Sequence, residues 1–258
     1  MRQVDSAFSA PSAPPVDQPA CWSGVLERLG FAIAPDVVDA ETVSQLIRVV
    51  DAIPREAKAL ERGGRIYAMR NILSLLPETR RIAESKTLTD LVRGVLGPRA
   101  FVVRGLLFDK TPEANWGVPW HQDLTIAVKA RRDAPGYGPW TVKEGVPHVQ
   151  PPIEVLERML TVRVHLDESA PDRGPLRVVP GSHRAGRLGA EATREWLSRV
   201  QPQTCLVPRG GALLMHPLIL HASSPVESPG RRRVIHLEYA AGPLPGGVDW
   251  FESESPGS

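Results

Sequence analysis

Thr161-Val162-Arg163-Val164-His165-Leu166 is the stretch that best indicates the fold, because apolar and polar side chains alternate along it. Successive side chains of a β-strand point to opposite faces, so this alternation predicts a half-buried strand. Turns such as Pro180-Gly181 and Pro229-Gly230 separate it from further short apolar runs. Strands are predicted at 101–103 with 106–108, 176–179, 204–207, 212–215, 218–222 and 232–239. Many short, punctuated strands are typical of a jelly roll or a barrel.

The first third of the chain has a helical pattern instead. Val25, Leu26 and Leu29 recur at helical spacing, and a second apolar stripe follows the capping residue Asp39. A third helix is predicted from Pro77 to Leu96, where Gly97-Pro98 would end it. The pattern predicts a mainly β protein with flanking helices.

The organisation along the chain is that of one catalytic unit. Residues 1–20 are rich in Pro, Ala and Ser without periodicity, which predicts a flexible N-terminal tail. Residues 21–258 are predicted to form a single domain, a common size for β folds. Within it, residues 131–152 hold many Gly and Pro residues without a clear period and are predicted to be a long insertion.

Composition excludes several classes of function. The formal net charge is only +2 and no run of Lys or Arg forms a footprint for nucleic acid. No apolar segment is long enough to cross a membrane, and the N-terminus does not have the pattern of a secretory signal. Cys21 and Cys205 match no metal or redox spacing, so we expect reduced thiols and a cytoplasmic protein. Nothing indicates an oligomeric state.

The sharpest local motif is Trp120-His121-Gln122-Asp123. In an extended strand, residues two apart point to the same face, so His121 and Asp123 can bind one metal ion. With a second, distant His they would form the two-His-one-carboxylate triad of non-haem Fe(II) enzymes, which leaves coordination positions open. A His-x-Asp pair alone is a weak signal, and its context decides its meaning.

That context is His221-Ala222-Ser223-Ser224-Pro225, followed by Arg232 eleven residues after His221, together with the turn 174–184. These features resemble the phytanoyl-CoA dioxygenase family of Fe(II)- and 2-oxoglutarate-dependent oxygenases, from about Leu26 to Tyr239. The resemblance implies a double-stranded β-helix, a cupin-like jelly roll, in which His221 completes the triad. His216 is the rival ligand, but the residue eleven positions beyond it is Glu227, which cannot bind a carboxylate. Many members have an Asn shortly after the Ser, and this chain has none there.

The resemblance also implies the cosubstrate site. A dicarboxylate needs a fixed cation, and the guanidinium of Arg232 provides a bidentate partner for its distal carboxylate. Ser223 shares a strand face with His221 and could donate its hydroxyl. Arg231 and Arg233 should point the opposite way, toward solvent. Further candidates for this pocket are Lys110, Thr161 and Trp140. For each of them a purely structural role is an equal alternative.

The resemblance implies Fe(II), 2-oxoglutarate and O2 as the reactants that act with the protein, and no catalytic side chain beyond the metal centre. The expected activity is hydroxylation of an unactivated C–H bond in a small organic molecule such as an amino acid or secondary metabolite, with release of succinate and CO2. Related halogenating enzymes lack the carboxylate, so Asp123 favours hydroxylation. Residues placed where substrate groups could lie are Arg65, Tyr67, Arg70, Asn71, Trp116 and Arg163.

Two functions of other classes remain open from the residues. A non-catalytic jelly roll that binds a small molecule would need neither the triad nor Arg232. A zinc hydrolase could use two His and one Asp, but it would need a nearby general base and has no use for Arg232.

Overall fold

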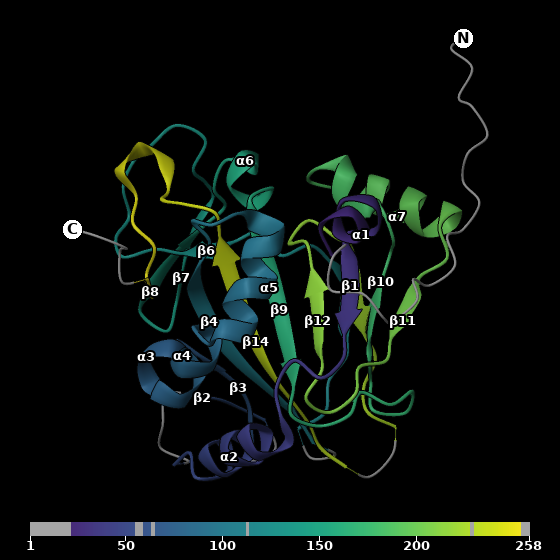
Figure 1. Cartoon of the computed structure of the whole chain (residues 1–258). Helices are drawn as coiled ribbons and strands as arrows, with labels where there is room; N and C mark the ends of the chain where they lie inside the picture. Colours follow the sequence, from purple (N-terminus) through teal and green to yellow (C-terminus); the bar gives the residue numbers. More distant parts are fainter. Residues whose placement is uncertain (1–21, 55–58, 63–64, 112–113, 228–229, 254–258) are drawn as a thin grey trace.

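The computed structural model describes residues 22–54, 59–62, 65–111, 114–227 and 230–253. Within these residues, antiparallel strands form two large sheets and one small one (Figure 1). The larger sheet has the order β1-β12-β9-β14-β4-β3-β2. Its strands are β1 (Phe31–Ala34), β2 (Ala59–Arg62), β3 (Arg65–Arg70), β4 (Phe101–Lys110), β9 (Met159–His165), β12 (Ala212–Met215) and β14 (Arg232–Ala240).

The second sheet has the order β11-β10-β13-β5, and the third has the order β6-β8-β7. Their strands are β5 (Val118–His121), β6 (Ile126–Ala127), β7 (Trp140–Lys143), β8 (Val146–Val149), β10 (Leu176–Val178), β11 (Gln203–Cys205) and β13 (His221–Ser223). Leu176 and Val178 of β10 share a core cluster with Leu213 and Met215 of β12, so the two larger sheets face each other. Two facing antiparallel sheets agree with the predicted jelly roll.

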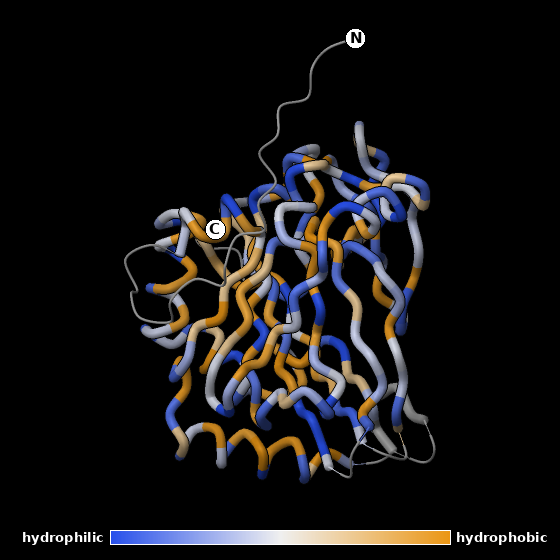
Figure 2. Tube along the Cα trace, turned by 90° about the vertical axis from the view of Figure 1, so that its right-hand side faces the viewer, coloured by the Kyte–Doolittle hydropathy of each residue, from blue (hydrophilic) through white to orange (hydrophobic). Residues whose placement is uncertain are grey.

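The helices of the first hundred residues cover the outer face of the larger sheet. Along the whole described chain, the helices are α1 (Trp22–Leu29), α2 (Ala40–Asp51), α3 (Ile72–Leu75), α4 (Pro77–Ala83), α5 (Lys86–Leu96), α6 (Ile153–Leu156) and α7 (Ala190–Arg199). Leu160, Val162 and Val164 of β9 pack in one core cluster with residues of α1, α2, α4 and α5. Figure 2 shows hydrophobic residues concentrated along the strands, with hydrophilic ones interspersed. β9 is therefore buried on both faces, and the expectation of a half-buried strand is wrong because helices cover its outer side.

The prediction of one helix from Pro77 to Leu96 is also wrong in detail. The chain breaks between α4 and α5 because Ser85 caps the second helix: its Oγ accepts a hydrogen bond from Leu88 N at 3.4 Å. A Ser side chain at this position satisfies a free amide of the first turn. The predicted cap Asp39 is found, since its carboxylate accepts from Thr42 N at 2.8 Å. α7 was not predicted, and none of its residues is buried.

The segment 131–152 is not a featureless insertion. It contains β7 and β8, which pair as a hairpin with β6 alongside. Glu144 and Gly145 join the two strands, and both have positive φ angles, 53° and 80°. Two consecutive residues of positive φ suit the right-handed twist of a tight hairpin. The turn was missed because a Glu at the first position is not a usual signal for it.

Other sequence predictions have mixed outcomes. Strands β1, β2 and β3 were not predicted, and the strand expected at 218–222 begins only at His221. Cys205 is a buried free thiol, and burial raises its pKa to about 12. The expected N-terminal tail and Cys21 lie outside the described residues.

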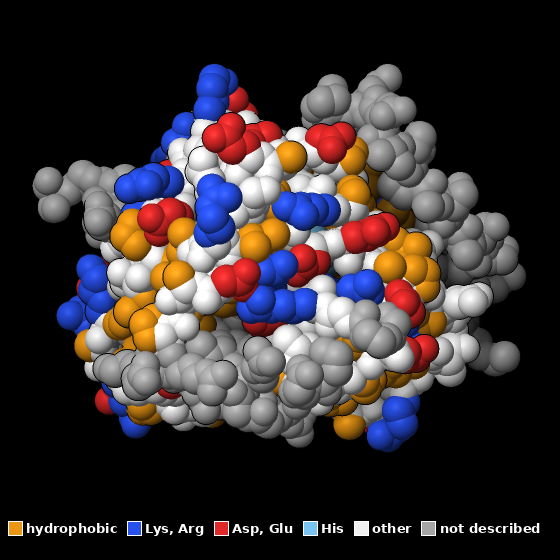
Figure 3. All heavy atoms as spheres, turned by 90° about the horizontal axis from the view of Figure 1, so that it is seen from below, with side chains coloured by type: hydrophobic (Ala, Val, Ile, Leu, Met, Phe, Trp, Pro, Cys, Tyr) orange, Lys and Arg blue, Asp and Glu red, His pale blue; other side chains and the backbone are white. Residues whose placement is uncertain are grey.

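Two observations bear on the classes that composition excludes. No helix in the described part of the chain combines the length and apolarity that a membrane span requires. On the face seen in Figure 3, Lys and Arg side chains are interspersed with Asp and Glu side chains, so this face has no continuous basic patch.

Candidate metal centre

Two strands that are far apart in the sequence build the centre. His221 of β13 is the register partner of His121 at the end of β5. Asp123 follows the end of β5, and its backbone N–H donates to Pro217 O at 3.0 Å. The Nε2 atom of His121 lies 3.7 Å from Asp123 Oδ1, and the Nε2 atom of His221 lies 3.6 Å from Asp123 Oδ2. Among the described residues, this is the group whose ligand atoms converge, all within 4.8 Å of one another.

Backbone carbonyls orient both imidazoles. His121 Nδ1 lies 2.8 Å from Pro119 O, and His221 Nδ1 lies 3.0 Å from Ile219 O. A carbonyl oxygen can only accept, so each Nδ1 carries the proton and each Nε2 presents its lone pair toward Asp123. This is the tautomer in which an imidazole binds a metal through Nε2, held in place by its second nitrogen.

The charge states fit a cation. Burial opposes ionisation of Asp123, but His221, His236, His121 and Arg163 together lower its pKa to about 2. Burial lowers the pKa of His221 to about 4, so this imidazole is neutral at pH 7. Asp123 Oδ2 is buried and has no hydrogen-bond partner among the described residues. Two imidazoles, of which that of His221 is neutral, and a carboxylate with a free oxygen suit a divalent transition-metal ion with open positions.

His216 does not join this group. Its Nδ1 accepts from Leu218 N at 3.2 Å, and its ring lies 5.2 Å from the ring of His183, measured between centroids. His183 in turn lies against the backbone carbonyl of Glu27. The two side chains form part of the packing between α1 and the turn after β10.

A second cluster, which we call the cation pair, consists of Arg232 and Lys110. The two residues are register partners on β14 and β4, and their exposed fractions are 3% and 1%. Lys110 Nζ donates to Ser223 Oγ at 3.0 Å and to Ser224 O at 2.9 Å. Arg232 Nε and Nη1 are buried without a hydrogen-bond partner among the described residues. The structure thus brings together three residues of the predicted cosubstrate site.

The cation pair has no acidic partner among the described side chains, which is electrostatically costly. Burial, and then the charges of Arg232 and Arg163, lower the pKa of Lys110 to about 7. Burial and the charge of Arg163 lower the pKa of Arg232 to about 9. Buried cations are normally paired, because desolvation of an unpaired charge costs several kcal/mol. The pair is therefore suited to bind a carboxylate.

The neighbours of Arg232 differ from the expectation. Arg233 forms a bidentate pair with Asp167, with two N–O distances of 2.8 Å, and is only 8% exposed. Arg231 contacts Asp51 and lies 2.8 Å from Asp109 Oδ1 through its Nε. They do point away from the interior, but into ion pairs instead of free solvent, because three aspartates from α2, β4 and the end of β9 surround them.

The two remaining cosubstrate candidates, Thr161 and Trp140, lie in different parts of the structure. Thr161 is 1% exposed and lies on the same face of β9 as Arg163 and His165, the face opposite the helices. Trp140 lies on β7, where it packs against a different core cluster and contacts the guanidinium of Arg131. No described contact joins Trp140 to Lys110 or Arg232.

The interior also holds a chain of polar side chains, of which sequence analysis singled out only Arg163, as a substrate candidate. Arg163 Nη1 donates to His236 Nδ1 at 2.7 Å, His236 Nε2 lies 3.4 Å from Glu238 Oε1, and Glu238 pairs with Arg104 at 3.1 Å. All four are buried. The signal was available, since residues 232, 234, 236 and 238 share a strand face, but the pattern does not reveal which partners face them.

The substrate candidates lie around this interior. Arg70 at the end of β3 pairs with Glu144, and Asn71 adopts a left-handed conformation with φ 60° before α3. The ring of Trp116 stacks edge-on against Tyr67 at 4.9 Å and lies 5.0 Å from Lys110 Nζ. Nothing is described for the side chain of Arg65.

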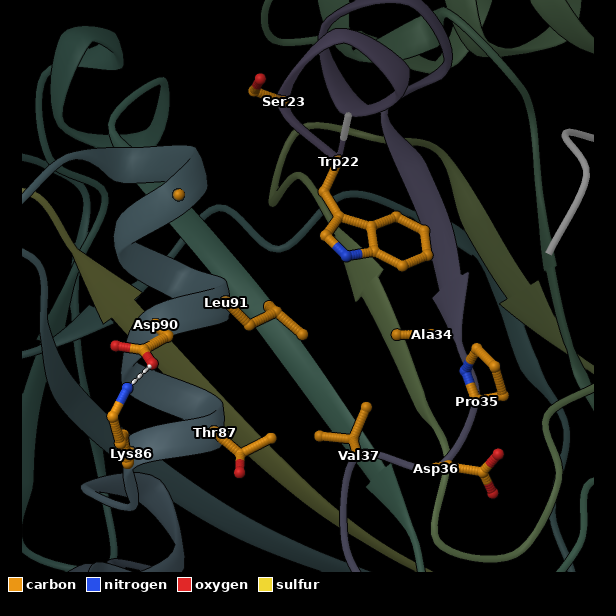
Figure 4. Close-up of a pocket in the computed structure, with 11 residues that line it drawn as sticks. Trp22, Ser23, Ala34, Pro35, Asp36, Val37, Lys86, Thr87, Asp90 and Leu91 are labelled. Carbon is orange, nitrogen blue, oxygen red and sulfur yellow. Dashed lines mark hydrogen bonds and ion pairs between the residues drawn. The ribbon is translucent and has the colours of Figure 1, made fainter. Parts of the chain in front are cut away.

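A cavity of about 660 Å³ lies away from this chemistry, between α1, β1 and α5. Trp22, Val37 and Leu91 line it, while Lys86 and Asp90 pair along α5 (Figure 4). It is on the helix side of the larger sheet, and it contains none of the triad residues.

Known proteins are similar to this chain in sequence. The chain is 24% identical over 196 residues to ectoine dioxygenase of Sphingopyxis alaskensis, covering 72% of this chain but only 57% of that enzyme. It is 24% identical over 242 residues to L-proline trans-4-hydroxylase of Streptomyces griseoviridis, covering 82% of each.

Solved structures agree in fold. EctD from S. alaskensis with 2-oxoglutarate and 5-hydroxyectoine matches with a TM-score of 0.70 at 23% identity, covering 95% of this chain and 88% of EctD. The epimerase SnoN, in complex with Fe3+, alpha ketoglutarate and nogalamycin RO, matches with a TM-score of 0.66 at 17% identity, covering 92% and 94%. The predicted cupin-like jelly roll is thereby confirmed. The family model of phytanoyl-CoA dioxygenase (PhyH) matches residues 26–234, and the chain therefore belongs to that family.

Proposed function

We propose that the protein is an Fe(II)- and 2-oxoglutarate-dependent dioxygenase that hydroxylates a small organic molecule. The observation that carries this proposal is the position of an unpaired, buried Arg232 and Lys110 in the same interior as the His121, Asp123 and His221 triad. A metal centre alone would serve many reactions. A metal centre beside a cationic pocket fits a cosubstrate that carries one group for the metal and a carboxylate for the protein.

Each residue has a defined task in this proposal. His121, Asp123 and His221 would hold the iron ion, with the imidazole orientations fixed by Pro119 O and Ile219 O. Arg232 and Lys110 would bind the distal carboxylate of 2-oxoglutarate, and Ser223, already a partner of Lys110, would add a hydroxyl. When bound, iron and 2-oxoglutarate supply the oxidising chemistry, in which O2 is consumed, 2-oxoglutarate yields succinate and CO2, and a C–H bond becomes C–OH. The buried walls exclude water from the reacting atoms.

The relatives support a small-molecule substrate. The names of two matched enzymes specify ectoine and L-proline, which are both small carboxylic acids. The PhyH family match is consistent with the oxygenase proposal. A zinc hydrolase is a weaker interpretation, because a cation pair without acid partners has no task in it.

Succinate formation tests the proposal. Purified protein with Fe(II), ascorbate and 2-oxoglutarate should form succinate slowly without substrate and faster with a substrate. Replacement of Fe(II) by Zn(II) should abolish succinate formation. If 2-oxoglutarate neither binds nor is consumed with Fe(II), the protein is a binding module or a hydrolase instead.

A further inference from the structure

A second group of cations lies next to the triad. Arg104 Nη1 donates to the backbone carbonyl of Thr125 at 3.5 Å, and Lys143 Nζ donates to the hydroxyl of the same residue at 3.4 Å. Thr125 follows Asp123 by two residues. Lys143 comes from the end of β7 and Arg104 from β4, so the small sheet and the larger sheet meet at this point.

Most of the positive charges in this group are compensated. Arg104 pairs with Glu238 at 3.1 Å, and Arg70 pairs with Glu144, the residue that follows Lys143. Lys143 itself has no acidic partner among the described side chains, and its one described polar contact is the neutral hydroxyl of Thr125. Of these three cations, Lys143 is therefore the one without an ion pair among the described side chains.

Burial and the neighbouring cations disfavour the charged form of Lys143. Burial lowers the pKa of Lys143, and the charges of Arg104 and Arg70 lower it further, while Glu238 and Asp123 act in the opposite direction. His148 does not compensate the charge of Lys143. His148 is 1% exposed, its Nδ1 donates to Val146 O at 3.0 Å, and burial followed by the charge of Arg104 lowers its pKa to about 4. An added anion would relieve repulsion between like charges.

This group differs from the cation pair. The charge of Arg104 acts on Lys143, His148 and Glu238, whereas that of Arg163 acts on Lys110, Arg232 and His165. Asp123 interacts with a charge from each of the two surroundings, since Arg163 lowers the pKa of Asp123 and Asp123 in turn raises the pKa of Lys143. Lys143 and the cation pair are thus distinct cationic positions, although the chain of Arg163, His236, Glu238 and Arg104 links their surroundings, and the cosubstrate carboxylate accounts for the cation pair alone.

We propose that Lys143, supported by Arg104 and oriented by Thr125, binds a carboxylate of the substrate. This rests on the proposed function, because the other cationic group is assigned to 2-oxoglutarate. The substrate class is then a small carboxylic acid whose oxidised carbon reaches the metal while its carboxylate is held at the end of β7. Solvation alone is the usual role of a surface Lys, but this side chain is only partly exposed and it touches the segment that carries Asp123.

Calorimetry on the full-length protein loaded with Mn(II) and 2-oxoglutarate tests this assignment, because Mn(II) prevents turnover. The probes are matched pairs of small carboxylic acids and their primary amides, with L-proline and L-prolinamide first. At least one acid should bind, and its amide should bind at least tenfold more weakly. Lys143→Met should lower the affinity for the acid at least tenfold, and Lys143→Arg should retain most of it. Lys129→Met, at an exposed position, should leave this affinity unchanged.

The inference is overturned if no acid binds, if amides bind as well as acids, or if Lys143→Met and Lys129→Met behave alike. Binding of 2-oxoglutarate itself, measured in the same variants, should be unchanged in all of them. If the wild-type protein fails to bind 2-oxoglutarate, the proposed function fails, and the acid titration without 2-oxoglutarate then decides the role of Lys143 separately.

Discussion

Arg232 and Lys110 are direct register partners across β14 and β4, and both cations are buried without an acidic partner among the described side chains. A sheet that places two positive charges opposite each other in its interior is less stable than one that does not, because both are desolvated and repel each other. A bound carboxylate removes this cost. The cation pair is thus a site prepared for an anion.

The first prediction concerns the metal. His121→Ala, Asp123→Ala and His221→Ala should each lower Fe(II) affinity by at least about tenfold, because each removes one of three ligands. His216→Ala is the matched control, since its ring packs against His183 and its Nδ1 is already bonded to Leu218 N. Calorimetric titration with Fe(II) measures the affinity of each variant. Loss of binding in His216→Ala together with normal binding in His221→Ala would assign the third ligand to His216.

The second prediction concerns the cosubstrate. Arg232→Ala should weaken the binding of 2-oxoglutarate by about 3–5 kcal/mol, which is at least about a hundredfold in affinity, because the carboxylate then lacks its guanidinium partner. Arg232→Lys should restore part of the affinity, since an ammonium cannot form two parallel hydrogen bonds. Equilibrium binding of 2-oxoglutarate to the Mn(II) protein is the measurement. Equal affinity in Arg232→Ala and wild type would place the carboxylate elsewhere.

The third prediction separates stability from binding. Arg233→Ala should lower the free energy of unfolding by about 1–3 kcal/mol, because Asp167 loses two charge-assisted hydrogen bonds in a nearly buried site. Arg231→Ala should also lower it by about 1–3 kcal/mol, because Asp109, whose side chain is only 5% exposed, loses its charge-assisted hydrogen bonds to the guanidinium. Urea denaturation measures both. Neither variant should change 2-oxoglutarate affinity in its folded state, and a hundredfold loss in either would show that strand register does not select Arg232.

The fourth prediction concerns pH. Burial and the charge of Arg232 lower the pKa of Lys110 from 10.5 to about 7, so the free protein loses this proton as pH rises above about 7. A bound carboxylate favours charged Lys110, and proton uptake should therefore accompany binding. Affinity for 2-oxoglutarate should fall between about pH 7 and 9, by up to tenfold per pH unit. Lys110→Met should bind more weakly at pH 7 and should have a flatter profile over this range.

The same shift affects the stability of the free protein in a defined direction. The unfolded chain holds the Lys110 proton more tightly than the folded one, because the folded pKa is depressed from 10.5 to about 7. The free energy of unfolding should therefore rise, and the folded state become more stable, as pH increases from about 7 to 10.5. Comparing wild type with Lys110→Met in urea at pH 7 and 9 isolates the contribution of Lys110. A difference that does not change with pH would contradict the shifted pKa.

Features that depend on local spacing can be predicted from the sequence. The strand alternation at 161–166 and the capped stripe after Asp39 identify a β protein with flanking helices. His121-x-Asp123, and the eleven residues from His221 to Arg232, identify the residues that the structure then brings into one interior. Such patterns are readable because a strand or helix fixes where neighbouring side chains point.

Which distant residues face one another depends on how the sheets and helices pack. Pairing of β13 with β5 brings His221 to His121, and helices on the outer face bury β9 completely. Partners also decided the roles of charged residues. Arg233 pairs with Asp167, whereas Arg232 has no acidic partner among the described side chains, although the two arginines are adjacent in the sequence. Local spacing sets the direction of a side chain, but burial and charge compensation depend on contacts between segments far apart in the chain, and these exist only once the sheets have packed.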